Sequence, residues 1–101
     1  MYRFKGFTQK ANVALNQAVA AAREFGHTYI GTEHIVLGLL REGTGVAATV
    51  LGAHGVDVEK YTNAILATEP AGHMTRLTPD DFTPRAKKTM EYAVKIGRAH
   101  V

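Results

Sequence analysis

Cysteine, serine and tryptophan are all absent from this sequence of 101 residues, and proline occurs only three times. The lack of cysteine excludes disulfides, thiolate metal ligands and thiol nucleophiles. The lack of serine excludes a serine–histidine–aspartate triad, and the sequence has no phosphate-binding loop that ends in Gly-Lys-Ser or Gly-Lys-Thr. Because a chain without cysteine suits a reducing compartment, we expect a cytoplasmic protein.

Long hydrophobic runs are also missing. None approaches the roughly 18 residues that span a bilayer, so we expect no membrane partner. The first six residues are basic but are not followed by an apolar stretch, which argues against a secretory signal. With 46% hydrophobic and 21% charged residues, the composition is that of an ordinary globular chain with one core. The net charge of +3 is a modest surplus and only weakly favours an acidic partner.

Five segments have the apolar periodicity of helices, and none alternates with the period of two that a half-buried strand requires. The class is therefore predicted to be all-α. The segments are approximately 8–25, 32–43, 46–54, 57–68 and 83–97. Thr8, Thr32, Asp57 and Thr83 are predicted N-caps, and Gly26 is the predicted C-terminal cap of the first helix.

The predicted helices differ in how much of their surface is apolar. The second is apolar nearly all round between Ile35 and Leu40, so it should be the buried one. In the third and fourth helices the apolar side chains predicted to face inward are Val46, Val50, Leu51, Val58, Tyr61, Ile65 and Leu66.

The sequence contains an internal repeat. Residues 7–11 (FTQKA) reappear as residues 82–86 (FTPRA), and Ala18-Val19 reappears as Ala93-Val94 at the same offset. The endings match only if four residues, about one helical turn, are missing from the second copy. We therefore expect a fifth helix that is one turn short.

The repeat predicts one complete unit and the opening helix of a second. The expected boundaries are a four-helix unit at 1–68, a linker at 69–81 and the first helix of the second unit at 82–101. The apolar face of that last helix (Met90, Ala93 and Val94) has to cover either the first unit or a second chain. A homodimer is therefore one expectation.

The residues 31–39 (GTEHIVLGL), followed by Arg41-Glu42-Gly43 and by residues 45–48 (GVAA), resemble the Clp amino-terminal repeat. The ClpC branch of AAA+ unfoldases is the most similar. Residues 82–88 (FTPRAKK) support the same resemblance at the second repeat. The resemblance implies a bundle of pseudo-repeated four-helix units that stands ahead of ATPase rings.

That resemblance also implies a function. The domain would dock adaptor proteins and deliver client proteins, including arginine-phosphorylated ones, to the motor for unfolding and degradation. The peptidase partner would be reached only through the motor, which this sequence does not contain. We therefore expect a non-catalytic recognition module rather than an enzyme, without a cofactor or a metal.

Glu33 and Thr8 are the leading candidates for binding a phosphoarginine tag. A carboxylate suits the guanidinium, and the amino end of a helix suits the phosphoryl group. The sequence interpretation places Glu33, with Thr32 beside it, opposite the start of the first helix, where Thr8 is the cap. Helix capping alone explains these residue types equally well.

Further candidates are basic or aromatic. Lys10 follows the first helix cap, and Arg85 follows the cap of the last helix, Thr83. Each of these basic side chains could add to the attraction of a phosphate. A solvated basic face is the plainer alternative. Phe4, if exposed, could anchor an adaptor, although core packing explains it too.

Two other readings of the sequence are weaker. His27 and His34 lack the spacing of a helical metal site and are expected to form loop and cap hydrogen bonds instead. A small nucleic-acid-binding domain is the alternative function, because the pI is near 9.4 and basic residues cluster at residues 85–88. The apolar second helix argues against it, so no nucleic-acid partner is expected.

Overall fold

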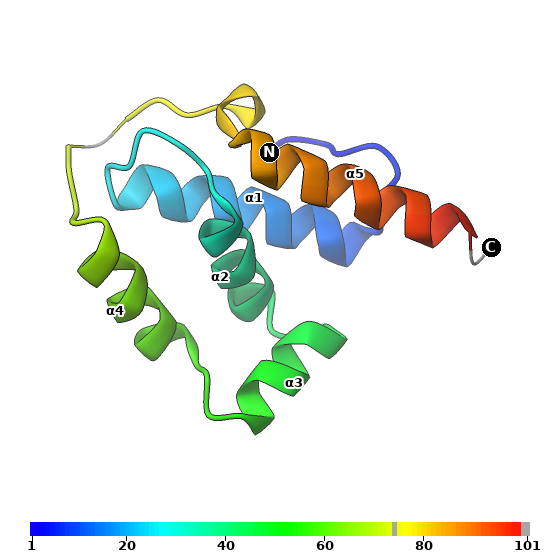
Figure 1. The fold of residues 1–101 in the computed structure, drawn as a ribbon, viewed down its shortest axis with the longest axis horizontal. Coiled ribbons are helices and arrows are strands. Elements are labelled where there is room, and N and C mark those ends of the chain that lie inside the picture. Colours follow the sequence, from blue (N-terminus) through cyan, green and yellow to red (C-terminus); the bar gives the residue numbers. More distant parts are fainter. Residues whose placement is uncertain (74, 100–101) are drawn as a thin grey trace.

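The computed structural model describes residues 1–73 and 75–99 and is all-α over these ranges, as the sequence predicts (Figure 1). It contains five α-helices and one short 3₁₀ helix: α1 (Gln9–Glu24), α2 (Thr32–Glu42), α3 (Val46–Ala53), α4 (Val58–Thr68), η1 (Pro79–Asp81) and α5 (Pro84–Ala99). One isolated parallel bridge joins Ile30 to Phe82.

α1 is the central helix, and its ends are set by local sequence. Thr8 caps the start, where its side-chain oxygen accepts a hydrogen bond from the Ala11 amide at 3.2 Å. Gly26 ends the helix with a left-handed φ of +68°, which costs a glycine little. α2 crosses α1 closely, because Gly38 lies directly against the backbone of Ala14 and Ala18.

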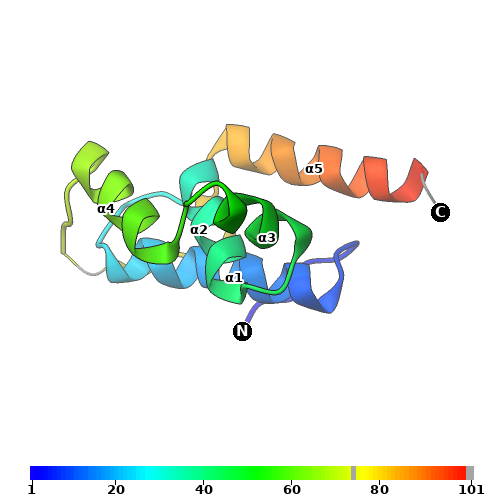
Figure 2. The same ribbon diagram turned by 90° about the horizontal axis from the view of Figure 1, so that it is seen from below.

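The described residues form two core clusters that meet on α1. One joins α1 to the start of α5 and contains the buried residues Leu15, Ala18, Val19, Ala22, Ile30, Leu77, Phe82 and Ala86. The other joins the end of α1 to α2 and α4 and contains Ala21, Phe25, Leu37 and Ile65. The start of α5 therefore packs on the rest of the bundle, beside α2 (Figure 2). Met90 of α5 contacts the first cluster.

The segment predicted as a linker is fastened to the first unit. Leu77 is buried in the core, and the Arg23 side chain donates to its carbonyl oxygen, with Nε at 3.0 Å. Farther up the segment, the Gly72 amide donates to the Phe25 carbonyl at 2.8 Å. The Thr75 hydroxyl donates to the His27 carbonyl at 2.7 Å. The described residues of this segment, 69–73 and 75–81, are thus attached to α1 and the loop after it.

Three sequence predictions about helix ends are corrected. Gly31, not Thr32, is the N-cap of α2, because the amide of Gly31 bonds to the His34 ring and Thr32 already lies in the helix. α5 continues through Gly97 to Ala99 and has 16 residues, the same as α1, so it is not a turn short.

α3 is also more exposed than its pattern predicts. Val46 is 81% exposed and Val50 49% exposed, and none of the α3 residues is buried. Val58, at the start of α4, is exposed as well. Inward orientation was therefore the wrong prediction for these three valines. For the two α3 valines the physical reason is that α3 packs mainly against α2, so among the described residues little covers the rest of its apolar surface.

In the described part of the chain, no single helix is long and apolar enough to cross a membrane; α2 and α3 meet that length and composition only jointly, with a bend of 93° between them.

Candidate binding sites

The amino-terminal segment runs along α1 and is held there by two asparagines. The Tyr2 amide donates to Asn16 Oδ1 at 2.7 Å, and Asn16 Nδ2 donates to the Tyr2 carbonyl at 2.7 Å. Asn12 pairs with the backbone of Phe4 in the same way, at 2.6 and 3.1 Å. Each amide side chain thus replaces a backbone partner. This pairing fixes the segment and positions Phe4 and Phe7.

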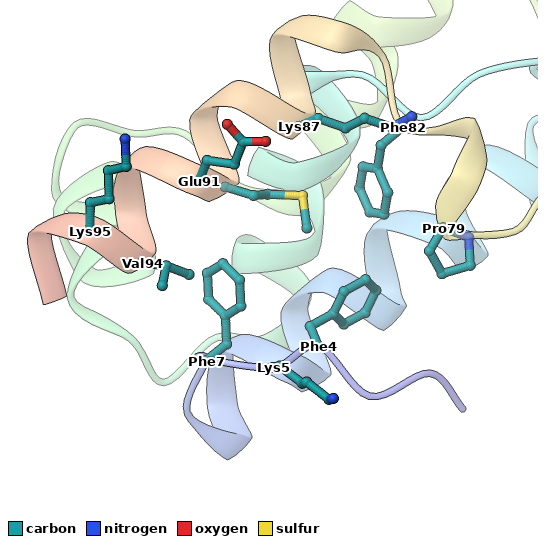
Figure 3. A pocket seen from close by; sticks show the side chains of 10 residues that line it. Phe4, Lys5, Phe7, Pro79, Phe82, Lys87, Glu91, Val94 and Lys95 are labelled. Atoms are coloured by element: carbon teal, nitrogen blue, oxygen red, sulfur yellow. The ribbon is translucent and has the colours of Figure 1, made fainter. Parts of the chain in front are cut away.

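A pocket of about 480 Å³ lies between this segment, η1 and α5 (Figure 3). Its walls are mostly apolar, and four charged side chains also line it. The lining residues are Phe4, Lys5, Phe7, Pro79, Phe82, Lys87, Met90, Glu91, Val94 and Lys95. Three of the charged side chains are lysines and one is a glutamate, so the pocket favours a ligand with an apolar group and a nearby negative charge.

Phe4 forms part of the wall and is half-buried. Its ring packs edge-on against Phe82, with centroids 6.0 Å apart and an interplanar angle of 83°. Gly6 has a φ of +86° and lies against Val94, where a Cβ would come within 3.1 Å of Val94 Cγ1. The tight turn at Gly6 therefore brings the amino-terminal segment onto α5. Phe4 thus packs against Phe82 and also lines an open pocket, and its use as an anchor for an adaptor stays a prediction.

Glu33 lies on a different face, at the start of α2. Its side chain is 38% exposed and folds over Gly31, where an added Cβ would meet Glu33 Oε1. A smaller cavity of about 200 Å³ opens beside it, lined by Glu33, Tyr61, Ala64, Ile65, Thr68 and Glu69. Two of these lining residues are carboxylates and none is basic. The cavity therefore favours a cation.

The pKa values of two tyrosines reflect the negative potential around Glu33. Burial raises the pKa of Tyr29, and the carboxylates of Glu33 and Glu69 raise it further. Burial also raises the pKa of Tyr61, with a further contribution from Glu33. In both cases a second negative charge beside the carboxylate is disfavoured. A guanidinium or ammonium group at this place would have the opposite effect and would be attracted.

Thr8 and Lys10 lie away from Glu33. Thr8 is about 25 Å from Phe25 along α1, at about 1.5 Å per residue. Glu33 is at the Phe25 end of that helix: its Oε1 is 4.0 Å from His34 Nδ1, and the His34 ring is 6.3 Å from the Phe25 ring. The expectation that Glu33 faces Thr8 is therefore wrong.

Lys10 lies near the other end of α2, close to Glu42. Hydrogen bonds from Thr44 lower the pKa of Glu42, and the nearby Lys10 lowers it further. Glu42 is the last residue of α2 and Glu33 is its second, so the start of α1 adjoins the end of α2. Thr8 and Lys10 therefore lie at the other end of α1 from Glu33, near Phe4, whose backbone pairs with Asn12.

Thr83 is the helix cap that the fold brings to the start of α2. The Thr83 amide donates to the Ile30 carbonyl at 2.9 Å, one residue before Gly31. Its hydroxyl caps α5 by accepting from the Ala86 amide at 3.1 Å. Pro84 has no N–H, so the Arg85 amide and its exposed guanidinium are the remaining donors of the first turn. Thr32, Glu33, Thr83 and Arg85 thus come from adjoining helix starts.

The chain matches the family described as the Clp repeat (R) N-terminal domain over residues 6–100. It belongs to this Clp N family. It is 40% identical over 97% of its length to the negative regulator of genetic competence ClpC/MecB of Bacillus subtilis (strain 168). It is 37% identical over 94% of its length to the chloroplastic chaperone protein ClpC2 of Oryza sativa subsp. japonica. The resemblance inferred from residues 31–48 and 82–88 is confirmed.

These relatives are much longer than the chain. It covers 12% of the Bacillus subtilis protein and 10% of the rice protein. A ClpA homolog from Guillardia theta, described as an ATP-binding subunit of an ATP-dependent Clp protease, is 38% identical over 94% of the chain and is covered to 12%. The Clp N chain therefore corresponds to a small part of each relative.

Several residues that build these Clp N sites were not singled out from the sequence. Asn12 and Asn16 hold the amino-terminal segment, and Arg23 ties Leu77 to Tyr2 through a 2.8 Å bond to the Tyr2 hydroxyl. The signal that could have found the asparagines is their i, i+4 spacing in an otherwise alanine-rich helix. Arg23 gives no comparable signal, because its partner Leu77 is 54 residues away.

Proposed function

We propose that this chain is a non-catalytic module that binds adaptor or client proteins on behalf of a ClpC-type unfoldase. The observation that carries the proposal is the aromatic pocket with its lysines, built on a Clp N fold. A pocket with an apolar floor and a few charged groups at its edge suits one side chain of a protein partner. Phe4 supplies part of that floor.

Binding of an adaptor at this pocket is tested by charge reversal at its edge. Lys87→Glu leaves the core untouched, because Lys87 is exposed. We expect it to weaken binding of an acidic, apolar-anchored peptide several-fold or more, whereas Lys60→Glu on the distant α4 leaves the affinity unchanged. Equal affinities of both folded variants, measured by calorimetry, contradict the proposed pocket.

Light scattering on the same samples tests the predicted homodimer.

The finer proposal is that Glu33 and the start of α5 bind a phosphoarginine side chain. The carboxylate of Glu33 suits the guanidinium, and the Thr83 hydroxyl with the donors of Arg85 suits the phosphoryl group. We propose Thr83 for this role in place of Thr8, and the hydrogen bond from the Thr83 amide to the Ile30 carbonyl, next to the start of α2, supports the choice. The family resemblance motivated this ligand, and the local charges support it.

Calorimetry with free phosphoarginine tests the finer proposal. Glu33→Gln removes the charge with little change in shape, and we expect roughly a tenfold or greater loss of affinity, as for a lost charged hydrogen bond. Thr83→Ala should also weaken binding, while Thr8→Ala should not. A folded Glu33→Gln variant with unchanged affinity refutes the role of Glu33. Arginine and inorganic phosphate, titrated separately, show which half of the ligand is recognised.

The nucleic-acid alternative gains no support from the fold. Arg85, Lys87 and Lys88 are exposed at the start of α5, but α2 is packed in the core through His34, Leu37, Gly38 and Leu40. It therefore offers no groove-reading face. A gel shift at low salt that shows tight, salt-dependent binding would revive this alternative.

A further inference from the structure

Two histidines are buried side by side between α1, α2 and the end of α4. His27 is 3% exposed and His34 is 0% exposed. His27 Nδ1 and His34 Nε2 are 2.9 Å apart, a hydrogen-bonding distance. The loop and cap hydrogen bonds expected from the sequence are present, and they join into one chain that includes a direct bond between the two rings.

The hydrogen bonds at the two ends of this chain fix the position of every proton. The Gly31 amide donates to His34 Nδ1 at 2.9 Å, so that nitrogen carries no proton. His34 is therefore protonated on Nε2 and donates to His27 Nδ1. His27 in turn is protonated on Nε2 and donates to the Glu69 carbonyl at 2.8 Å. Every ring nitrogen is satisfied only if both rings are neutral.

The chain of bonds fastens one side of the bundle. Gly31 is the cap of α2, His27 belongs to the loop after α1, and Glu69 is the C-cap of α4. Two further bonds, from Gly72 to Phe25 and from Thr75 to the His27 carbonyl, lie on the same side. A proton added to either ring puts an N–H opposite another N–H, so the chain of bonds has to break.

We infer that His27 and His34 form an acid-sensitive latch, which holds α4 and the 69–73 segment on the α1–α2 core and opens when one ring gains a second proton. Few other contacts oppose this opening, because Ile65 is the one buried residue of α4. The core cluster around Leu15, Val19 and Phe82 does not include α4 and stays closed.

The charged and titratable groups around the pair come from three elements. α2 contributes Glu33 and also Arg41, which lies over the Phe25 ring at 6.0 Å. The loop after α1 contributes Tyr29, which is stacked on the His27 ring at 5.9 Å. α4 contributes Tyr61, and its C-cap is Glu69. Burial lowers the pKa of His34 to about 4; the Glu33 carboxylate opposes this, and His27 adds to it. Burial is the largest effect, so the latch is closed at neutral pH.

Amide hydrogen exchange on the 101-residue chain, corrected for intrinsic rates, tests the latch. We expect the protection factors of residues 58–73 to fall at least tenfold between pH 6 and pH 4, while those of α1 and α5 are retained. His34→Gln should abolish this pH dependence, and His54→Gln, a change in the exposed histidine that caps the end of α3, should preserve it. Simultaneous loss of protection in α1, α4 and α5 overturns the latch.

Nitrogen-15 spectra of the unsubstituted chain decide the matter even if His34→Gln does not fold. At pH 7 both rings should show the proton on Nε2, and the ring titration should coincide with the shift changes of the amides at 69–73. A His34 ring that titrates near its ordinary value of 6.5, with those amides unmoved, overturns the proposal.

Discussion

Gly38 and Gly52 are both helical glycines, yet replacing each with alanine should change stability in opposite directions. Alanine is favoured over glycine within a helix by about 1 kcal/mol. At Gly38 a new Cβ would overlap the Ala14 carbonyl oxygen and come within 3.0 Å of the Ala18 nitrogen. At Gly52, in α3, a Cβ would meet nothing within 4 Å. The difference between the two variants isolates the close crossing of α1 and α2.

The magnitude follows from these contacts. Overpacking of a core costs about 1–3 kcal/mol, and the upper end applies at Gly38, because the obstructing atoms belong to the backbone and cannot rotate away. After the gain in helix propensity, Gly38→Ala should lower the free energy of unfolding by about 2 kcal/mol. Gly52→Ala should raise it by up to about 1 kcal/mol.

Urea denaturation followed by circular dichroism measures both values. For a domain of this size, about 1 kcal/mol corresponds to 4–8 °C in Tm, so the two variants should melt clearly on either side of the original chain. A Gly38→Ala variant as stable as the original chain refutes the close helix crossing. A destabilised Gly52→Ala variant instead indicates that α3 is packed and not exposed.

Four further results follow from the same structure. Arg23→Gln loses the bonds to the Leu77 carbonyl and should cost about 1–3 kcal/mol of unfolding free energy in urea. Val46→Thr should change that free energy by less than about 0.5 kcal/mol, because Val46 is exposed. Thr83→Ala removes a helix cap and should lower Tm by the equivalent of about 1 kcal/mol. The pKa of His34 in the folded chain, about 4, lies below its ordinary value of 6.5, so the unfolded chain binds more protons between these two pH values. Urea titrations should therefore show the free energy of unfolding falling by up to about 3 kcal/mol from pH 6.5 to pH 4.

Features that depend on neighbours in the chain were predictable. Thr8 and Gly26 bound α1 because each acts on backbone groups within a few residues. The same is true of Asp57, whose side chain accepts from the Lys60 amide at 2.8 Å. The start of α5 at Thr83-Pro84 also follows from local chemistry, a capping hydroxyl followed by a proline that needs no N–H partner.

Features that depend on which other elements pack beside a helix were not predictable from the sequence. The apolar pattern of α3 predicts a side for Val46 and Val50 but not whether another helix covers that side. Gly31 is the N-cap of α2 because its amide donates a hydrogen bond to the buried ring of His34. The prediction that Glu33 faces Thr8 was wrong, and the sequence already contained the reason. The short connection after Gly26 brings the start of α2 to the end of α1, away from Thr8.

Both candidate sites combine residues of α5, or of its start, with residues from earlier in the chain. The aromatic pocket takes Phe4 and Phe7 from the first unit and Met90 and Val94 from α5. The second site takes Glu33 from α2, and its phosphoryl-binding groups would come from the start of α5. The bridge between Ile30 and Phe82 joins these pieces. Because Phe82 and Ala86 also fill the core around Leu15, we expect the start of α5 to be needed both for stability and for either proposed binding surface.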